Sequence, residues 1–266
     1  KGDPEAAIDS YKEALKIKPD YADAYYNMGV ALMNKGDPEA AIDSYKEALK
    51  IKPDYADAYY NMGVALMNKG DLEAAIDSYK KVLKIKPDYA EAYNNMGLTL
   101  MDKGDLEAAI DSYKQALKIK PDYAKAYNNM GNALEDKGDL EAAIDSYNQA
   151  LKIKPDYAKA YNNMGVALMD KGDLEDAIDS YKQALKIKPD YAEGFNNMGN
   201  ALKGLVFNKP NSGLMEVMIS LLDQRTFCMP KDIAPAAISL LKLEPTLKEL
   251  LEKHSLGTLR QPLQET

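Results

Sequence analysis

Apolar residues recur along most of the chain at the spacing of an α-helix, in short stretches separated by polar residues. Residues 88–121 illustrate the pattern, which comprises two such stretches. In the first, the positions i, i+3, i+4 and i+7 are Tyr93, Met96, Gly97 and Leu100. In the second, the apolar face is made of Leu106, Ala109, Ile110, Tyr113, Ala116 and Leu117. Each stretch is amphipathic, which predicts two helices that pack against each other.

Polar and conformationally special residues predict where these two helices begin and end. Asp88 is expected to cap the first helix, with Glu91 completing a pair of the capping-box type. Gly104 is expected to end that helix in a left-handed conformation, and Asp105 is expected to cap the second helix. Pro121 should end the second helix because proline cannot continue the helical hydrogen-bond ladder.

The two-helix pattern repeats at a fixed interval of 34 residues. The triplet Lys-Gly-Asp begins at Lys1, Lys35, Lys69, Lys103, Lys137 and Lys171. Residues 1–34 and 35–68 are identical, which indicates a recent duplication or an engineered array. Other aspartates at repeat spacing, such as Asp54 and Asp71, are expected to be helix caps in the same way as Asp88. A fixed period of this kind predicts a solenoid in which each unit contacts its neighbours.

The repeat resembles the tetratricopeptide repeat (TPR), a helix–turn–helix unit of the same length with the pattern W-x2-L-G-x2-Y…A-x3-F…P. The matching positions here are Tyr93, Met96, Gly97, Leu100, Ala109, Tyr113 and Pro121. Tyr replaces Trp, Leu replaces the second Tyr, and the small residues Gly97 and Ala109 let the two helices approach closely. The resemblance covers roughly residues 1–203. It implies an all-α fold, a right-handed superhelical solenoid of antiparallel helix pairs.

We expect a TPR array over residues 1–203 and a short helical cap or connector over residues 204–266. The array would contain five complete repeats over residues 22–191, with a half-repeat at each end. The first helix, Asp3–Ile17, keeps the apolar face of its siblings but has no upstream partner in the sequence. This predicts either truncation of a longer array or self-association through the open N-terminal end.

The segment after the array contains helix-like stretches at about residues 212–223, 230–243 and 245–254. We expect them to fold back and cover the C-terminal end of the solenoid. The segment is shorter than a catalytic domain of usual size.

Composition argues against several classes of function. The chain has 34 Lys and Arg against 42 Asp and Glu, a net charge of −8, which disfavours binding to nucleic acid or to a membrane surface. Cys228 and His254 are the only residues of their types and belong to no catalytic or metal-binding motif. We therefore expect no enzyme activity, no metal and no cofactor. The single cysteine and the lack of a long apolar run are compatible with a cytoplasmic protein.

In TPR proteins the first helix of each repeat lines a concave groove that binds peptides, so the resemblance implies a binding site there. An asparagine precedes the core methionine in every first helix. These residues are Asn27, Asn61, Asn95, Asn129, Asn163 and Asn197. Because an amide both donates and accepts hydrogen bonds, such a stripe could hold the backbone of an extended peptide. The stripe resembles the asparagine ladder of a TPR superhelix. The alternative is that duplication copied one asparagine, which bonds locally between helices.

Positions that differ between repeats carry more information about a ligand. The residue before each of these asparagines is Tyr26 and Tyr60 in the first two repeats, followed by Asn94, Asn128, Asn162 and Asn196. The residue in the first helical turn is Asp23, Asp57, Glu91, Lys125, Lys159 and Glu193. A lysine there opposes the helix dipole. The pattern indicates basic or apolar peptide groups near the early repeats and a carboxylate near Lys125 and Lys159. Neutral drift of surface residues is the alternative.

Taken together, these features predict a protein–protein interaction scaffold that binds an extended peptide or a partner protein in the groove. Two alternatives stay open at this point. In the first alternative, the array is a targeting or substrate-recruiting domain of a larger transferase-type enzyme. In the second, it is a self-assembling structural array.

Overall fold

A computed structural model describes residues 3–203, 205 and 230–243, and the structural statements below refer to these residues. They form helices and no strands. The first helices of the repeats are α2 (Ala22–Lys35), α4 (Ala56–Lys69), α6 (Ala90–Lys103), α8 (Ala124–Asp136), α10 (Ala158–Lys171) and α12 (Ala192–Leu202). The second helices are α1 (Pro4–Ile17), α3 (Pro38–Ile51), α5 (Leu72–Ile85), α7 (Leu106–Ile119), α9 (Leu140–Ile153) and α11 (Leu174–Ile187). A further helix, α14 (Pro230–Leu241), follows the array.

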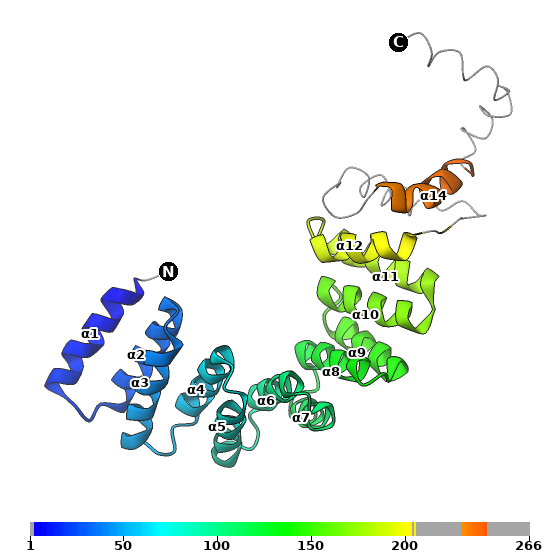
Figure 1. Cartoon of the computed structure of the whole chain (residues 1–266). Coiled ribbons are helices and arrows are strands. Elements are labelled where there is room, and N and C mark those ends of the chain that lie inside the picture. Colours follow the sequence, from blue (N-terminus) through cyan, green and yellow to red (C-terminus); the bar gives the residue numbers. More distant parts are fainter. Residues whose placement is uncertain (1–2, 204, 206–229, 244–266) are drawn as a thin grey trace, which may run out of the picture. The chain divides into compact units, whose positions relative to one another are not determined.

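The helices pack as consecutive pairs, as the sequence predicts. The tightest pairs are α2 with α3, α4 with α5, α6 with α7, α8 with α9, and α10 with α11 (Figure 1). The chain divides into two compact units, residues 1–153 and 154–266. Within the first unit α2 also touches α4, α4 touches α6 and α6 touches α8; within the second, α10 touches α12. We call the side on which these first helices meet the first-helix face.

Glycine and aspartate end and begin the helices at most of the expected positions. Gly104 has a φ of 87°, and its N–H donates to the carbonyl groups of Leu100 and Met101. Asp105 then caps α7, because its carboxylate accepts from the N–H of Ala108 at 3.2 Å. Both predictions are confirmed. Asp71 caps α5 in the same way, accepting from the N–H of Ala74 at 3.3 Å.

The prediction that Asp88 caps the following helix is wrong. Helix α6 begins at Ala90, and its N-cap residue is Tyr89, whose side chain makes no capping bond. Asp88 contributes only its backbone carbonyl, which accepts from the N–H of Ala90 at 3.1 Å. The Tyr89 ring stacks on the ring of Tyr60, with centroids 5.1 Å apart. At this cap position the side chain therefore packs on the preceding repeat and makes no capping bond.

The same correction applies to Asp54, since Tyr55 is the N-cap residue of α4. Glu91 does not complete a capping box either. Its carboxylate forms an ion pair with Lys120 at 3.2 Å. The sequence pattern alone therefore placed the start of the first helices too early by one residue.

Each pair is held by a tyrosine of the second helix that lies against a glycine of the first. A Cβ atom at Gly97 would lie 2.7 Å from Cε1 of Tyr113, closer than real Cβ contacts allow. Tyr113 and Ala109 are completely buried. The predicted reason for the small residues Gly97 and Ala109 is thus confirmed.

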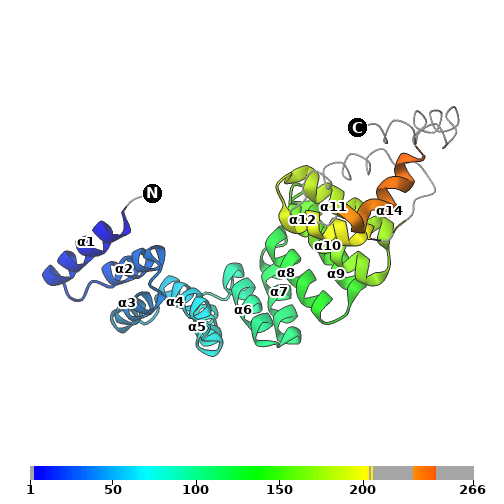
Figure 2. The same ribbon diagram turned by 45° about the horizontal axis from the view of Figure 1, so that its top comes forward.

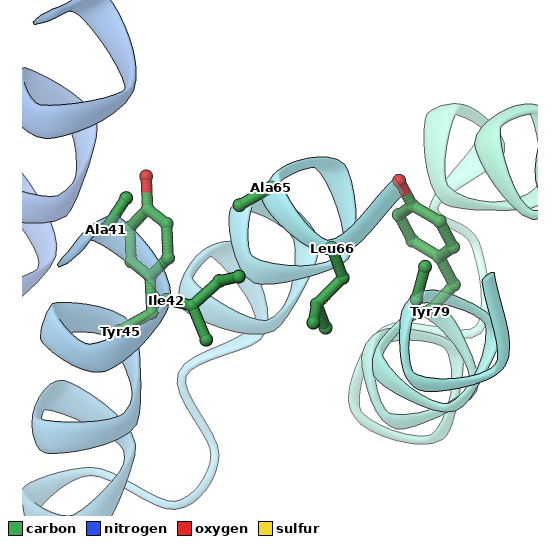
Figure 3. Close-up of a cluster of buried hydrophobic side chains, with 7 residues drawn as sticks. Ala41, Ile42, Tyr45, Ala65, Leu66 and Tyr79 are labelled. Carbon is green, nitrogen blue, oxygen red and sulfur yellow. The ribbon is translucent and has the colours of Figure 1, made fainter. Parts of the chain in front are cut away.

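The core continues from one pair to the next within a unit. Figure 3 shows Ala41, Ile42 and Tyr45 of α3 next to Ala65 and Leu66 of α4, with Tyr79 of α5 beyond them. Because the same small and aromatic residues recur in each repeat, each additional helix pair extends this core by one repeat.

Helix α14 packs against α12 and so covers part of the end of the array (Figures 1 and 2). Its buried residues are Ala236, Ala237, Ser239 and Leu240. Of the predicted stretch at residues 230–243, Pro230–Leu241 is helical. The other two expected stretches, at 212–223 and 245–254, lie outside the described residues, as do Cys228 and His254.

Candidate peptide-binding face

The asparagine stripe forms hydrogen bonds between consecutive first helices. Each bond runs from the Nδ2 of one asparagine to a residue of the preceding repeat. The bonds are Asn61 to Tyr26 Oη at 3.0 Å, Asn95 to Tyr60 Oη at 2.9 Å, Asn129 to Asn94 Oδ1 at 3.0 Å and Asn197 to Asn162 Oδ1 at 3.0 Å. The amide donor of each is therefore engaged within the fold, as the local-bonding interpretation of the stripe requires.

These bonds persist through the change from tyrosine to asparagine along the chain. Both side chains offer an oxygen that accepts a hydrogen bond, so either can receive the amide of the next repeat. Asn94 is fully buried and also donates to Asn95 Oδ1 at 3.1 Å. The larger Tyr60 stays partly exposed, with its ring 6.0 Å from that of Tyr79.

The structure places the predicted site residues in three environments. The exposed ones are Asn27, Lys125 and Lys159. The partly buried ones are Tyr26, Tyr60, Asn61, Asn95, Asn163 and Asn197. The buried ones are Asn94, Asn128, Asn129 and Asn162. Contact between any of them and a peptide stays a prediction, and a buried residue would reach a ligand only if the helices moved apart.

The acids in the first helical turn pair with lysines at the end of the same repeat. Asp57 lies 3.3 Å from Lys86 Nζ, and Glu91 lies 3.2 Å from Lys120 Nζ. These lysines were not among the predicted site residues. The signal for them is the Lys-Ile-Lys-Pro run that closes each repeat.

Repeats four and five carry lysine at this first-turn position. Lys125 and Lys159 are both exposed, and neither makes an ion pair with a residue that the structure describes. In the fifth repeat the lysine equivalent to Lys86 and Lys120 is Lys188, whose Nζ lies 4.9 Å from the ring centroid of Tyr191. The two positions that form an ion pair in repeats two and three are therefore both occupied by lysine in repeat five.

The fourth repeat has a polar cluster where its neighbours are apolar. Asn132 and Glu135 occupy the positions of Val30 and Met33. The Tyr147 hydroxyl lies 2.8 Å from Asn132 Oδ1 and 2.7 Å from Glu135 Oε2. Burial and the negative charge of Glu135 raise the pKa of Tyr147 above its usual range, so this hydroxyl stays a donor.

A small pocket opens on the first-helix face between α2 and α4. Its volume is about 110 Å³, and it is lined by Val30, Met33, Asn34, Tyr45, Asn61 and Val64. Its apolar walls and few amides are the composition expected of a site that takes an apolar side chain.

Two further kinds of feature are absent from the described part of the chain. Within it no group of three or more His, Cys, Asp or Glu side chains could hold a metal ion. None of its helices combines the length and the apolar character needed to cross a membrane.

The family described as "TPR repeat" matches the sequence in six consecutive segments. They are residues 1–36, 31–70, 65–103, 97–138, 131–172 and 165–205. A search of curated proteins gave no match.

Several solved structures are similar in fold. MamA is 31% identical, with a TM-score of 0.58 over 65% of this chain and 94% of that protein. YrrB, described as a TPR protein with an unusual peptide-binding site, is 23% identical, with a TM-score of 0.57 over 70% of this chain and 96% of its own. PilF of Pseudomonas aeruginosa is 17% identical, with a TM-score of 0.64 over 88% of this chain and 97% of its own.

Proposed function

Because the chain belongs to the tetratricopeptide-repeat family, a family of protein-interaction scaffolds, we propose that it binds an extended peptide along its first-helix face and selects for an acidic group at Lys159. This proposal concerns binding alone and involves no catalytic step.

The pair of Lys159 and Lys188 carries the proposal. In repeats two and three the equivalent positions form ion pairs, so the lysine there is already neutralised by a carboxylate of the same repeat. In repeat five both positions are cationic, and an acidic side chain or a terminal carboxylate of the ligand would supply the missing charge. Bonds from lysine to carboxylate are charge-assisted and stronger than neutral hydrogen bonds. Lys125 occupies the same position in repeat four and is likewise exposed.

The early repeats favour apolar ligand groups over basic ones. Asp57 and Glu91 are neutralised by Lys86 and Lys120, so they offer little net charge to a ligand. The surface nearby consists of the half-buried Tyr26 and of the small pocket between α2 and α4. Aromatic side chains are typical anchors of protein interfaces.

A displayed library of random peptides tests the proposal directly. The wild-type chain should enrich peptides that contain Asp or Glu, and their affinity should fall as salt concentration rises. Lys159→Glu should lose this preference, because the new carboxylate can pair with Lys188 as Asp57 pairs with Lys86. Lys186→Glu is the matched control, since Lys186 is an exposed lysine on the second helix of the same repeat. Selection of the same peptides by Lys159→Glu and by the wild type would contradict the proposal.

A further inference from the structure

The pocket between α2 and α4 contains a tyrosine hydroxyl that the fold leaves without a hydrogen bond. Tyr45 lines this pocket, and its exposed fraction is only 1%. Its hydroxyl makes no hydrogen bond with the described residues. In Figure 3 the ring rises from α3 with the hydroxyl at its far end. The hydroxyls of Tyr79 and Tyr113 are sealed from solvent, whereas that of Tyr45 stays open to a group that enters the pocket.

Repeat four shows which groups satisfy a hydroxyl at this position. There the equivalent tyrosine, Tyr147, has its hydroxyl 2.8 Å from Asn132 Oδ1 and 2.7 Å from Glu135 Oε2. The residues at these two positions of repeat one are Val30 and Met33, whose side chains offer no oxygen. In repeat one an oxygen of a ligand would therefore have to supply what the first helix supplies in repeat four.

Helix α4 contributes a hydrogen-bond acceptor to the same pocket. Asn61 donates its Nδ2 to Tyr26 Oη at 3.0 Å, and its Oδ1 accepts no hydrogen bond from the described residues. One repeat later the equivalent oxygen, on Asn95, already accepts from Asn94 Nδ2 at 3.1 Å. The pocket between α2 and α4 thus combines an open donor with an open acceptor.

A primary carboxamide matches this combination. Its oxygen can accept from Tyr45 Oη while its NH2 group donates to Asn61 Oδ1. A carboxylate has no donor for the Asn61 oxygen, and neither lysine nor arginine is among the described residues that line the pocket. A wholly apolar side chain would suit the walls but would cover both polar groups without pairing them, which costs free energy.

The rest of the pocket suits the stem of the same side chain. Val30, Met33 and Val64 provide apolar walls for CH2 groups, and glutamine offers them one CH2 group more than asparagine. The volume of about 110 Å³ admits a side chain, whereas sites for whole small molecules measure about 300–1,000 Å³. We propose that this pocket binds the side chain of a glutamine in the extended peptide. The inference rests on the proposed function, because the glutamine belongs to a peptide on the first-helix face.

The displayed library that tests the acidic preference also tests this inference. The wild-type chain should enrich peptides that contain glutamine. Tyr45→Phe should lose this enrichment, although it keeps the ring that packs against Gly29. Tyr113→Phe is the matched control, because that ring packs against Gly97 in the same way and its hydroxyl is sealed from solvent. Equal enrichment of glutamine by Tyr45→Phe and by the wild type would overturn the inference.

Acidic residues and glutamine are scored separately in the selected peptides. Acidic peptides without glutamine would overturn this inference alone. Glutamine without acidic residues would support it and would overturn only the selection at Lys159. A chain that enriches no peptide at all would contradict both proposals.

Synthetic versions of one selected peptide measure the effect of the amide. Replacement of its glutamine by methionine should weaken binding to the wild type by about tenfold, because Tyr45 Oη and Asn61 Oδ1 are then covered without partners. The same replacement should weaken binding to Tyr45→Phe by a smaller factor, and the difference isolates the hydroxyl. Fluorescence anisotropy gives the four affinities. Equal losses with the two chains would rule out a bond from the peptide to Tyr45.

Two variants of the pocket provide an independent check. Val64→Leu introduces the residue found at the equivalent position Leu98, and it should fill the pocket. Met33→Glu introduces the counterpart of Glu135, which should give the Tyr45 hydroxyl an acceptor within the chain. Both should remove the preference for glutamine over methionine, and circular dichroism would verify that each variant is folded. A preference that survives in both folded variants would place the glutamine elsewhere and overturn the inference.

Discussion

Gly97 and Tyr113 are in such close contact that the ring occupies the space where any other residue would place its Cβ. The same relationship recurs in every complete repeat, so the tyrosine ring sets the distance between the two helices of a pair. It also makes the glycine a packing residue in the middle of a helix, where glycine ordinarily weakens the structure.

Gly97→Ala is expected to lower the free energy of unfolding by about 1–3 kcal/mol, because the added methyl group overpacks the Tyr113 contact. This sign is opposite to the ordinary effect, in which alanine stabilises a helix interior by roughly 0.5–1 kcal/mol relative to glycine. Urea denaturation followed by circular dichroism measures it. Gly194→Ala is the control, since a Cβ there would lie 3.2 Å from both Leu185 Cδ2 and Tyr191 Cδ1, against 2.7 Å from the Tyr113 ring at Gly97. Equal stabilisation by both substitutions would contradict the packing argument.

Tyr113→Phe is expected to raise the free energy of unfolding by about 1 kcal/mol. The hydroxyl of Tyr113 is buried and has no hydrogen-bond partner in the described structure, so its removal relieves a desolvation cost. Tyr147→Phe should have the opposite effect, because that hydroxyl bonds to Asn132 and Glu135. Thermal or urea unfolding of the two single variants side by side decides the matter; two changes of the same sign would refute it.

Asn129→Ala is expected to lower the free energy of unfolding by about 1–3 kcal/mol, since it leaves the buried Asn94 carbonyl without this donor. Asn27→Ala should have little effect, because Asn27 is exposed and lacks a described hydrogen bond. Chemical denaturation of both variants makes the comparison. Asn129→Ala could therefore lose peptide binding because the fold is destabilised. Only a loss of binding in a variant of unchanged stability indicates direct contact with the peptide.

Stability is expected to fall steeply above pH 10. Burial raises the pKa of Tyr113 above its ordinary value of 10.0, and burial together with Glu135 does the same for Tyr147. The unfolded chain then loses these protons at a lower pH than the folded chain. The stabilisation is thus complete below pH 10.0 and lost as pH rises, by roughly 1.4 kcal/mol per pH unit for each such tyrosine.

This loss can be followed by recording tyrosinate absorbance and helical circular dichroism during an alkaline titration. The buried tyrosines should ionise only as the helices unfold, and Tyr113→Phe should make the fall in stability shallower. Full ionisation of all tyrosines in a chain that keeps its helices would contradict the expectation.

The sequence was sufficient to predict the helices, their pairing and the role of Gly97, because these depend on residues within one repeat. It failed at Asp88, where the neighbouring Tyr89 packs on Tyr60 of the preceding repeat. The burial of Asn94 was missed for the same reason. A first helix uses one side to pack on its partner and another to meet the next repeat, and a single helical period reports only the first.

The hydrogen bond from Asn129 to Asn94 could not be predicted from the sequence pattern either. The residues are separated by 35 positions, and an amide that binds a ligand has the same sequence signature as one that binds a neighbouring helix. Lys159 is different, because the change from an acid at Asp57 to a lysine is visible in the sequence. The structure adds that the acid at this position forms an ion pair in other repeats.

The identity of α1 and α3 makes the cohesive energy between neighbouring repeats directly measurable. Intrinsic helix propensity and solvation of the unfolded state are the same for both segments, so any difference in amide hydrogen exchange between them reports adjacent packing alone. The arrangement predicts that the chain opens first at α1, with α3 protected by the energy of one additional interface.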